Sequence, residues 1–266
     1  MHFNKLSTFA KKNIQGTLHF LLPPPQRFAV ITRGRTGSNL LMSLLASHPE
    51  IRECGEVVGE WQLRERAVKQ AILEMGPAAY MEHSFRRRGL ESFLGVKMLY
   101  RNFERKYAER WGVKELPKVL DYLQAHRDIK IIHMKRRNRL RSLVSGKIAA
   151  HTKQFKLVDK KQPVKDIQLE LSIKECAWIF ERVEQFERKY EEIFRDHQYS
   201  EVYYEDLVAH RERECNRLLE YLGARRRPLK TRLLKQNKRS LPEVVRNYDA
   251  LKSHFAGTEW GVYFED

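Results

Sequence analysis

Residues 33–41, which read RGRTGSNLL, are the first in the chain whose types and spacing suit chemistry. Their glycines let backbone N–H groups approach an anion closely, and a helix that begins there adds the positive end of its dipole. Arg35 contributes a permanent charge, and Thr36, Ser38 and Asn39 contribute side-chain donors. We therefore predict an anion-binding loop, with a capped turn before a helix as the alternative.

The loop lacks the lysine that ATP-hydrolysing enzymes need. Their motif, G-x-x-x-x-G-K-[ST], places a lysine on the terminal phosphates and a hydroxyl on Mg²⁺. Here Gly37 is followed by Ser38 and Asn39. ATP hydrolysis is therefore disfavoured, although a kinase-like nucleotide enzyme that prefers ATP with Mg²⁺ stays open as a rival.

A second basic segment, KRRNRLRSLVSGK at residues 135–147, also suits an anion. Asn138 is a favourable N-cap for a helix. Cations are unfavourable at the positive end of a helix dipole, so a bound anion would resolve the crowding there. The alternative is a solvated basic face. The crowded arginines are Arg136, Arg137, Arg139 and Arg141.

Both segments join a predicted strand to a predicted helix. Short apolar runs rich in β-branched residues predict strands at 28–32 and 129–134, and apolar positions on one face predict helices at 38–47 and 138–150. The same patterns predict further strands at 93–99 and 201–204 and further helices at 61–75, 116–125, 173–194 and 212–222. Strands that alternate with helices imply a parallel sheet covered on both faces. The predicted fold is a P-loop-like three-layer α/β/α domain with a central, mostly parallel sheet.

The composition is compatible with one folded α/β domain that binds anions. Of 266 residues, 42% are hydrophobic, and Lys and Arg outnumber Asp and Glu by 51 to 34, a net charge of +17. That charge favours anionic partners without choosing among them. Aromatic residues occur mostly at core spacing rather than between basic ones, which does not favour nucleic acid as the partner.

Residues 1–27 are predicted to form a basic N-terminal extension ahead of a domain at 28–266. The apolar run at 18–22 is too short to span a bilayer, and no small-residue cleavage site follows it. Peripheral contact of this extension with a membrane surface stays open, as does a homodimer.

The cysteines predict a reducing, cytoplasmic compartment. There are three of them, and no pair has metal-ligand spacing. They are Cys54, Cys176 and Cys215.

The glycine loop resembles the 5′-phosphosulfate loop of sulfotransferases that use 3′-phosphoadenosine 5′-phosphosulfate (PAPS). That loop has the outline P-[RK]-[ST]-G-[ST]-[ST]-x-L, and residues 35–39 match it position by position. Gly34 stands where the family usually has proline, and Asn39 stands where it usually has a hydroxyl residue.

The second basic segment resembles the family's 3′-phosphate site. There an arginine at the strand end and a serine eight residues later hold the phosphate, and Arg137 and Ser145 have this separation. Arg139 replaces a proline often found in the family. The order of residues in this segment is similar to that in bacterial carbohydrate sulfotransferases of the nodulation-factor and trehalose types. The resemblance extends from Phe28 to the C-terminus.

The resemblance implies transfer of a sulfuryl group from PAPS to an acceptor hydroxyl, on a saccharide or glycolipid, with release of adenosine 3′,5′-bisphosphate. A nucleotide-binding pseudo-enzyme is the alternative. No metal is expected, because arginine and lysine can hold the transferred group. The expected nucleotide contacts include a basic C-terminal loop and are Arg33, Arg35, Thr36, Gly37, Ser38, Asn39, Arg137, Ser145, Lys235 and Lys238.

Three residues are expected to act in catalysis. Glu56 matches the Gly-Glu of the nodulation-factor type and is the expected general base. Arg35 would act as a fixed charge on the leaving phosphate oxygen, and the family counterpart of Lys97 lies by the reaction centre. Glu60 and His133 are the alternative bases.

Overall fold

A five-stranded parallel sheet forms the centre of the computed structural model, which describes residues 22–155, 157, 167–234 and 239–265. The strand order is β2-β3-β1-β4-β5, and every pairing between these strands is parallel. The carboxyl ends of the strands therefore share one edge of the sheet. The strands are β1 (Gln26–Thr32), β2 (Ile51–Glu53), β3 (Phe93–Leu99), β4 (Lys130–Lys135) and β5 (Tyr199–Tyr203).

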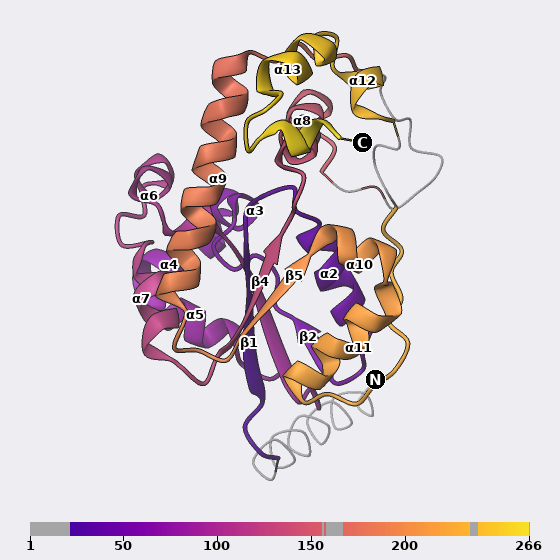
Figure 1. The fold of residues 1–266 in the computed structure, drawn as a ribbon. Helices are drawn as coiled ribbons and strands as arrows, with labels where there is room; N and C mark the ends of the chain where they lie inside the picture. The colour runs from indigo at the N-terminus through magenta and orange to yellow at the C-terminus, as the bar shows by residue number, and fades with distance from the viewer. Residues whose placement is uncertain (1–21, 156, 158–166, 235–238, 266) are drawn as a thin grey trace, which may run out of the picture.

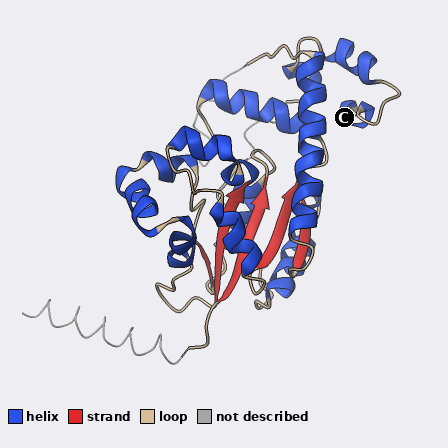
Figure 2. Ribbon diagram, turned by 90° about the vertical axis from the view of Figure 1, so that its left-hand side faces the viewer, coloured by secondary structure: helices blue, strands red, loops and turns tan. Residues whose placement is uncertain are grey.

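Helices cover both faces of the sheet, as Figure 2 shows. Along β1, Ala29 and Ile31 belong to one apolar core and Phe28 and Val30 to another, because successive strand residues point to opposite faces. The first core includes α4 (Arg66–Met75), α5 (Pro77–Ser84), α6 (Arg105–Trp111), α7 (Lys118–Ala125) and the end of α9 (Ile173–Ile193). The second includes α2 (Ser38–Leu45), α10 (Tyr204–Ala209) and α11 (Arg211–Leu222). The three-layer α/β/α prediction is confirmed.

A third apolar core lies beyond the carboxyl edge of the sheet (Figure 1). The start of α9 reaches this core, so α9 connects it to the sheet. The predicted cap is present, since Asn138 Oδ1 accepts a hydrogen bond of 2.8 Å from the N–H of Arg141. The elements that build this core are α8 (Arg139–Thr152), α12 (Leu241–Val244), α13 (Tyr248–Phe255) and the 3₁₀ helix η2 (Gly261–Phe264).

The sequence predictions were wrong at one helix and missed several elements, among them α5, α6, α12 and α13. The single helix expected at 61–75 is two helices, α3 (Glu60–Arg64) and α4, because the backbone of Glu65 is extended between them. The three-residue strand β2 and the six-residue helix α10 are too short to show a periodic pattern, and neither was predicted. Within the described residues, no helix combines the length and the apolar character that crossing a bilayer requires.

Candidate active site

The predicted anion-binding loop lies at the carboxyl edge of the sheet, between β1 and α2. Arg35 and Gly37 both have a left-handed backbone, with φ of 70° and 88°. A Cβ on Gly37 would lie 2.3 Å from Cδ2 of Tyr204, so only glycine fits between the loop and α10. Thr36 is buried and donates a 3.0 Å hydrogen bond to the carbonyl of Arg33, which fixes the shape of the loop from inside.

A cavity opens beside this loop, between α2, α8, α10 and α12. Apolar side chains that include Val144, Leu157 and Leu241 form part of its wall. The described lining also contains five arginines and neither Asp nor Glu. Such a one-signed cluster favours an anionic ligand. The arginines are Arg35, Arg136, Arg141, Arg211 and Arg239.

Arg35 and Ser145 meet at this cavity. Arg35 Nε donates a 3.1 Å hydrogen bond to Ser145 Oγ, and Nη1 donates one of 3.1 Å to the carbonyl of Phe155. Burial lowers the pKa of Arg35, and the neighbouring cation Arg136 lowers it further. A guanidinium stays charged in proteins, so the lowered pKa reflects the free-energy cost of desolvating the charge of Arg35. A bound anion would offset that cost.

Arg136, rather than Arg137, lines the cavity. The Arg136 guanidinium lies 4.6 Å from the ring centroid of Tyr204, and its Nη1 donates a 3.2 Å hydrogen bond to the carbonyl of Arg35. Arg137 instead donates two hydrogen bonds of 2.8 and 2.7 Å to the carboxylate of Asp206. Tyr204 and Asp206, both on α10, therefore contact different arginines of this neighbouring pair.

Two other predicted nucleotide contacts, Arg33 and Thr36, are also absent from the described lining of the cavity. Arg33 Nη1 donates a 3.2 Å hydrogen bond to Ser142 Oγ, and its guanidinium lies in the field of Glu187 on α9. Arg33 and Arg35 thus diverge from the loop. Lys235 and Lys238 lie outside the described residues.

Lys97 connects the predicted base to the loop. Its side chain is largely buried on β3, and Nζ donates a 2.7 Å hydrogen bond to Asn39 Oδ1 and lies 3.2 Å from Glu56 Oε2. Asn39 lines the cavity. The carboxylate of Glu56 rests against Gly59, where an added Cβ would lie 2.6 Å from Glu56 Oε1. Three residues singled out from distant parts of the sequence are therefore in contact.

Neither alternative base is as well placed as Glu56. A hydrogen bond from the Arg64 guanidinium lowers the pKa of the Glu60 carboxyl, which weakens it as a proton acceptor. His133 is fully buried, and its two ring nitrogens are hydrogen-bonded to the hydroxyls of Tyr100 and Tyr199. Burial lowers the pKa of His133 to about 3, so the ring is neutral.

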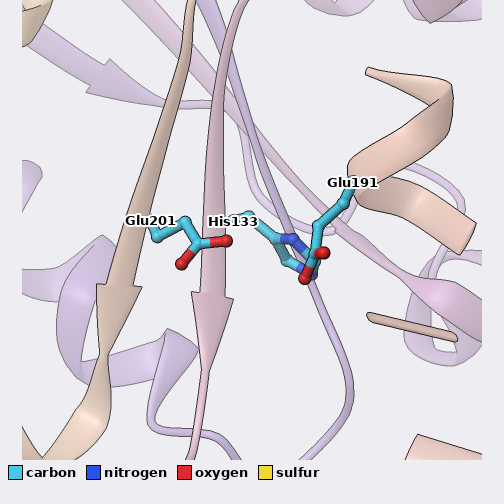
Figure 3. Close-up of side chains that lie close together, drawn as sticks. All are labelled: His133, Glu191 and Glu201. Atoms are coloured by element: carbon cyan, nitrogen blue, oxygen red, sulfur yellow. The ribbon is translucent and has the colours of Figure 1, made fainter. Parts of the chain in front are cut away.

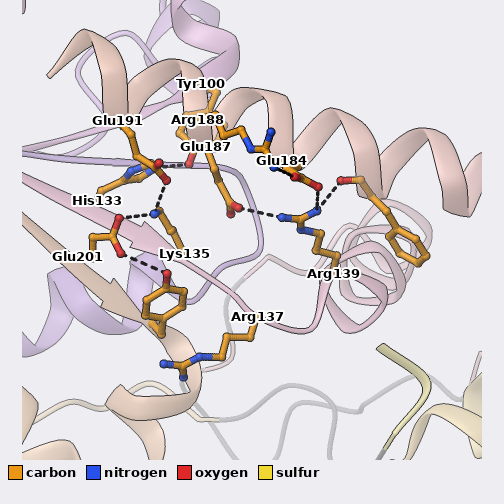
Figure 4. Close-up of polar contacts among 12 residues, drawn as sticks. Tyr100, His133, Lys135, Arg137, Arg139, Glu184, Glu187, Arg188, Glu191 and Glu201 are labelled. Carbon is orange, nitrogen blue, oxygen red and sulfur yellow. Dashed lines mark hydrogen bonds and ion pairs between the residues drawn. The ribbon is translucent and has the colours of Figure 1, made fainter. Parts of the chain in front are cut away.

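A polar cluster around the buried His133 contains one set of metal-like ligands. Donor atoms of His133, Glu191 and Glu201 lie within 4.8 Å of one another (Figure 3). Lys135 Nζ, however, contacts both carboxylates, at 2.5 Å from Glu191 and in a short hydrogen bond to Glu201 (Figure 4). The ammonium supplies the positive charge, and both nitrogens of His133 have partners, so these residues do not fit a metal ion.

Glu187 in this cluster is expected to make stability depend on pH. Burial raises its pKa to about 7, against the opposing effect of Arg139 and Lys135. The folded state then holds a proton that the unfolded chain loses near its ordinary pKa, so stability falls as the pH rises from about 4.5 to 7. Glu187→Gln removes this titration. We expect the variant to gain up to about 3 kcal/mol relative to wild type between pH 4.5 and 8.

Urea unfolding of both proteins at pH 5 and pH 8 measures this difference. Glu184→Gln is the control, because Glu184 lies 3.1 Å from Arg139 and its loss reports the cost of removing an ion pair to the same arginine. An equal difference between Glu187→Gln and wild type at the two pH values contradicts the prediction.

The fold and the site define an α/β protein whose glycine loop lies between β1 and α2 and lacks the NTPase lysine. The model of the family described as "Sulfotransferase family" matches residues 28–228. The chain belongs to the sulfotransferase family.

Individual relatives agree with this assignment. The chain is 27% identical to Nodulation protein H of Rhizobium tropici over 92% of this chain and 95% of the relative. It is also 27% identical to Nodulation protein H of Rhizobium meliloti strain 1021, over 91% of this chain and 96% of the relative. The crystal structure of a sulfotransferase from Alicyclobacillus acidocaldarius has a similar fold, with a TM-score of 0.51, 16% identity and coverage of 88% of this chain and 92% of that one.

Proposed function

We propose that this sulfotransferase moves a sulfuryl group from PAPS to a hydroxyl of a saccharide or glycolipid and releases adenosine 3′,5′-bisphosphate. The observation that carries the proposal is the cavity lined by five arginines, with Lys97 and Glu56 next to its glycine loop. The saccharide class follows from the resemblance to carbohydrate sulfotransferases. We also propose a cytoplasmic location, which fits three free cysteines, Cys54, Cys176 and Cys215.

In this proposal both phosphate ends of PAPS bind along the part of the cavity where Arg35 of the loop contacts Ser145 of α8. The 5′-phosphosulfate lies on the backbone N–H groups of residues 36–39 and the charge of Arg35. The 3′-phosphate lies on Ser145 with Arg136 and Arg141, because these two arginines line the cavity whereas Arg137 is held by Asp206. Arg33 is left without a proposed nucleotide contact.

The proposed reaction is an in-line displacement at sulfur. Glu56 accepts the proton of the acceptor hydroxyl while a bond forms between that oxygen and sulfur. The bond from sulfur to the bridging phosphate oxygen breaks, and its electron pair stays on that oxygen, where Arg35 and Lys97 balance the charge. In this step Glu56 is the base, and Arg35 and Lys97 provide the positive charge.

Substitution of Arg136 tests the position of the 3′-phosphate. Arg136→Ala is expected to weaken binding of adenosine 3′,5′-bisphosphate by about 10–100-fold, since it removes a partly desolvated charge-assisted contact. Arg137→Ala is the matched control, and we expect its affinity to stay within about threefold of wild type. Titration calorimetry measures both affinities. A larger loss of affinity in Arg137→Ala than in Arg136→Ala would support the original prediction, in which Arg137 binds the 3′-phosphate.

The activity itself is tested with PAPS labelled in its sulfuryl group and a panel of saccharides and glycolipids, with products identified by mass spectrometry. Thermal shift measurements separate the kinase-like rival, which predicts stabilisation by ATP with Mg²⁺ rather than by adenosine 3′,5′-bisphosphate alone. Binding of the bisphosphate without transfer to any acceptor would identify a pseudo-enzyme.

A further inference from the structure

We propose that a row of side chains leading from Lys97, beside the glycine loop, to the outer surface of α3 binds a neutral sugar ring of the acceptor, with Trp61 as its stacking platform. This inference rests on the proposed function and names the residues that would give it saccharide specificity. We call these residues the acceptor row, and they are Glu56, Arg101, Glu60, Arg64 and Trp61.

The acceptor row is a continuous series of contacts that begins beside the cavity, at Lys97, which bonds the cavity-lining Asn39. Glu56, which contacts Lys97, has its Oε1 3.8 Å from Arg101 Nη2. The same Arg101 nitrogen lies 3.9 Å from Glu60 Oε2, and Arg64 Nη2 lies 2.5 Å from Glu60 Oε1. The row therefore runs from the proposed base to the first turns of α3, next to the carboxyl edge of the sheet (Figure 1).

Trp61 ends this row with a largely exposed indole. Its relative exposure is 66%, compared with 60% for Trp178, the other strongly exposed tryptophan among the described residues. The Arg64 guanidinium lies 5.4 Å from the ring centroid, so the ring is held at one place while most of its surface meets solvent. A single exposed aromatic side chain is common on its own. Here it adjoins polar groups that lead to the reaction centre.

The charges of the acceptor row favour a neutral, hydroxyl-rich ligand. The row alternates two carboxylates with two guanidiniums, whereas the described lining of the nucleotide cavity has arginines and no carboxylate. Carboxylate acceptors and guanidinium donors can bond the two sides of neighbouring hydroxyls, and the flat apolar ring can pack on the C–H face of a pyranose. A neutral sugar satisfies both features, because the carboxylates and guanidiniums of the row balance each other in charge.

Binding of neutral sugars to the enzyme tests this proposal without requiring transfer. The probes are β1,4-linked hexasaccharides of glucose and of N-acetylglucosamine, titrated in the presence of saturating adenosine 3′,5′-bisphosphate. Trp61→Ala is expected to weaken binding of the preferred hexasaccharide about tenfold, and Trp61→Phe to retain most of the affinity. Trp178→Ala is the control of equal size on α9, with affinity and bisphosphate binding expected to match wild type.

Three results overturn the acceptor row: no hexasaccharide binding by wild type, equal binding by Trp61→Ala, or equal losses in Trp61→Ala and Trp178→Ala. Steady-state kinetics add a second readout, because loss of a stacking platform should raise the KM for the sugar and leave the KM for PAPS unchanged. Failure of the proposed function is read separately, as absence of transfer of labelled sulfur from PAPS to any acceptor.

Discussion

Replacing Glu56 with glutamine is expected to lower kcat by about 10²–10⁴-fold, the usual contribution of a general base. Glutamine keeps the size of the side chain and an oxygen that can accept from Lys97, which lies 3.2 Å from the carboxylate. It loses the negative charge and the ability to take a proton from the acceptor. Affinity for adenosine 3′,5′-bisphosphate should barely change, because Glu56 is not among the residues that line the nucleotide cavity.

Initial rates with saturating PAPS and acceptor measure the effect of Glu56→Gln. Glu53→Gln provides the control, since Glu53 is an exposed carboxylate at the end of β2, three residues earlier in the chain. We expect this control to keep the wild-type rate. Full activity of Glu56→Gln would refute the assignment of the base, even if the other parts of the site are correct.

Replacing Arg35 with alanine is expected to reduce kcat/KM by about 10³–10⁵-fold, comparable with loss of an arginine that neutralises a transferring phosphoryl group. The Arg35 side chain carries a positive charge of the loop itself, and its Nε donates a 3.1 Å hydrogen bond to Ser145 Oγ. The backbone of residue 35 has a φ of 70°, which disfavours alanine as much as arginine, so the substitution tests the side chain rather than strain.

Arg35→Lys distinguishes charge from geometry. Lysine keeps a positive charge but cannot reproduce the planar fork that contacts both Ser145 and the Phe155 carbonyl, so an intermediate rate is expected. Single-turnover measurements separate slower transfer from weaker binding. A kcat/KM of Arg35→Ala within tenfold of wild type would remove Arg35 from the reaction centre.

Local patterns in the sequence were sufficient for four of the five strands and for the longer helices α2, α7, α8, α9 and α11. The apolar run at 93–99 predicted β3 with its observed bounds, and Asn138 and Gly223 predicted a helix start and a helix end. These features depend on neighbouring residues alone. The prediction that residues 33–41 bind an anion rests on the same kind of local signal, because glycines and donors act together at short range.

The direction of side chains at the site depended on distant partners and was not readable. The local sequence does not show which of the neighbouring Arg136 and Arg137 lines the cavity. Tyr204 contacts Arg136 and Asp206 bonds Arg137, and both partners lie on α10, a helix that was not predicted. Arg33 turns toward Ser142 on α8. The contact between Asn39 and Lys97 required the register of β1 against β3, which pairs Val30 with Lys97.

The contact of Tyr204 with Gly37 makes the loop a product of the finished architecture. The ring would overlap any Cβ on Gly37, and it belongs to a helix that follows the last strand of the sheet. An excised peptide with the sequence of the loop would therefore lack the wall against which it is moulded. Anyone who grafts this loop onto another scaffold must transplant α10 with it.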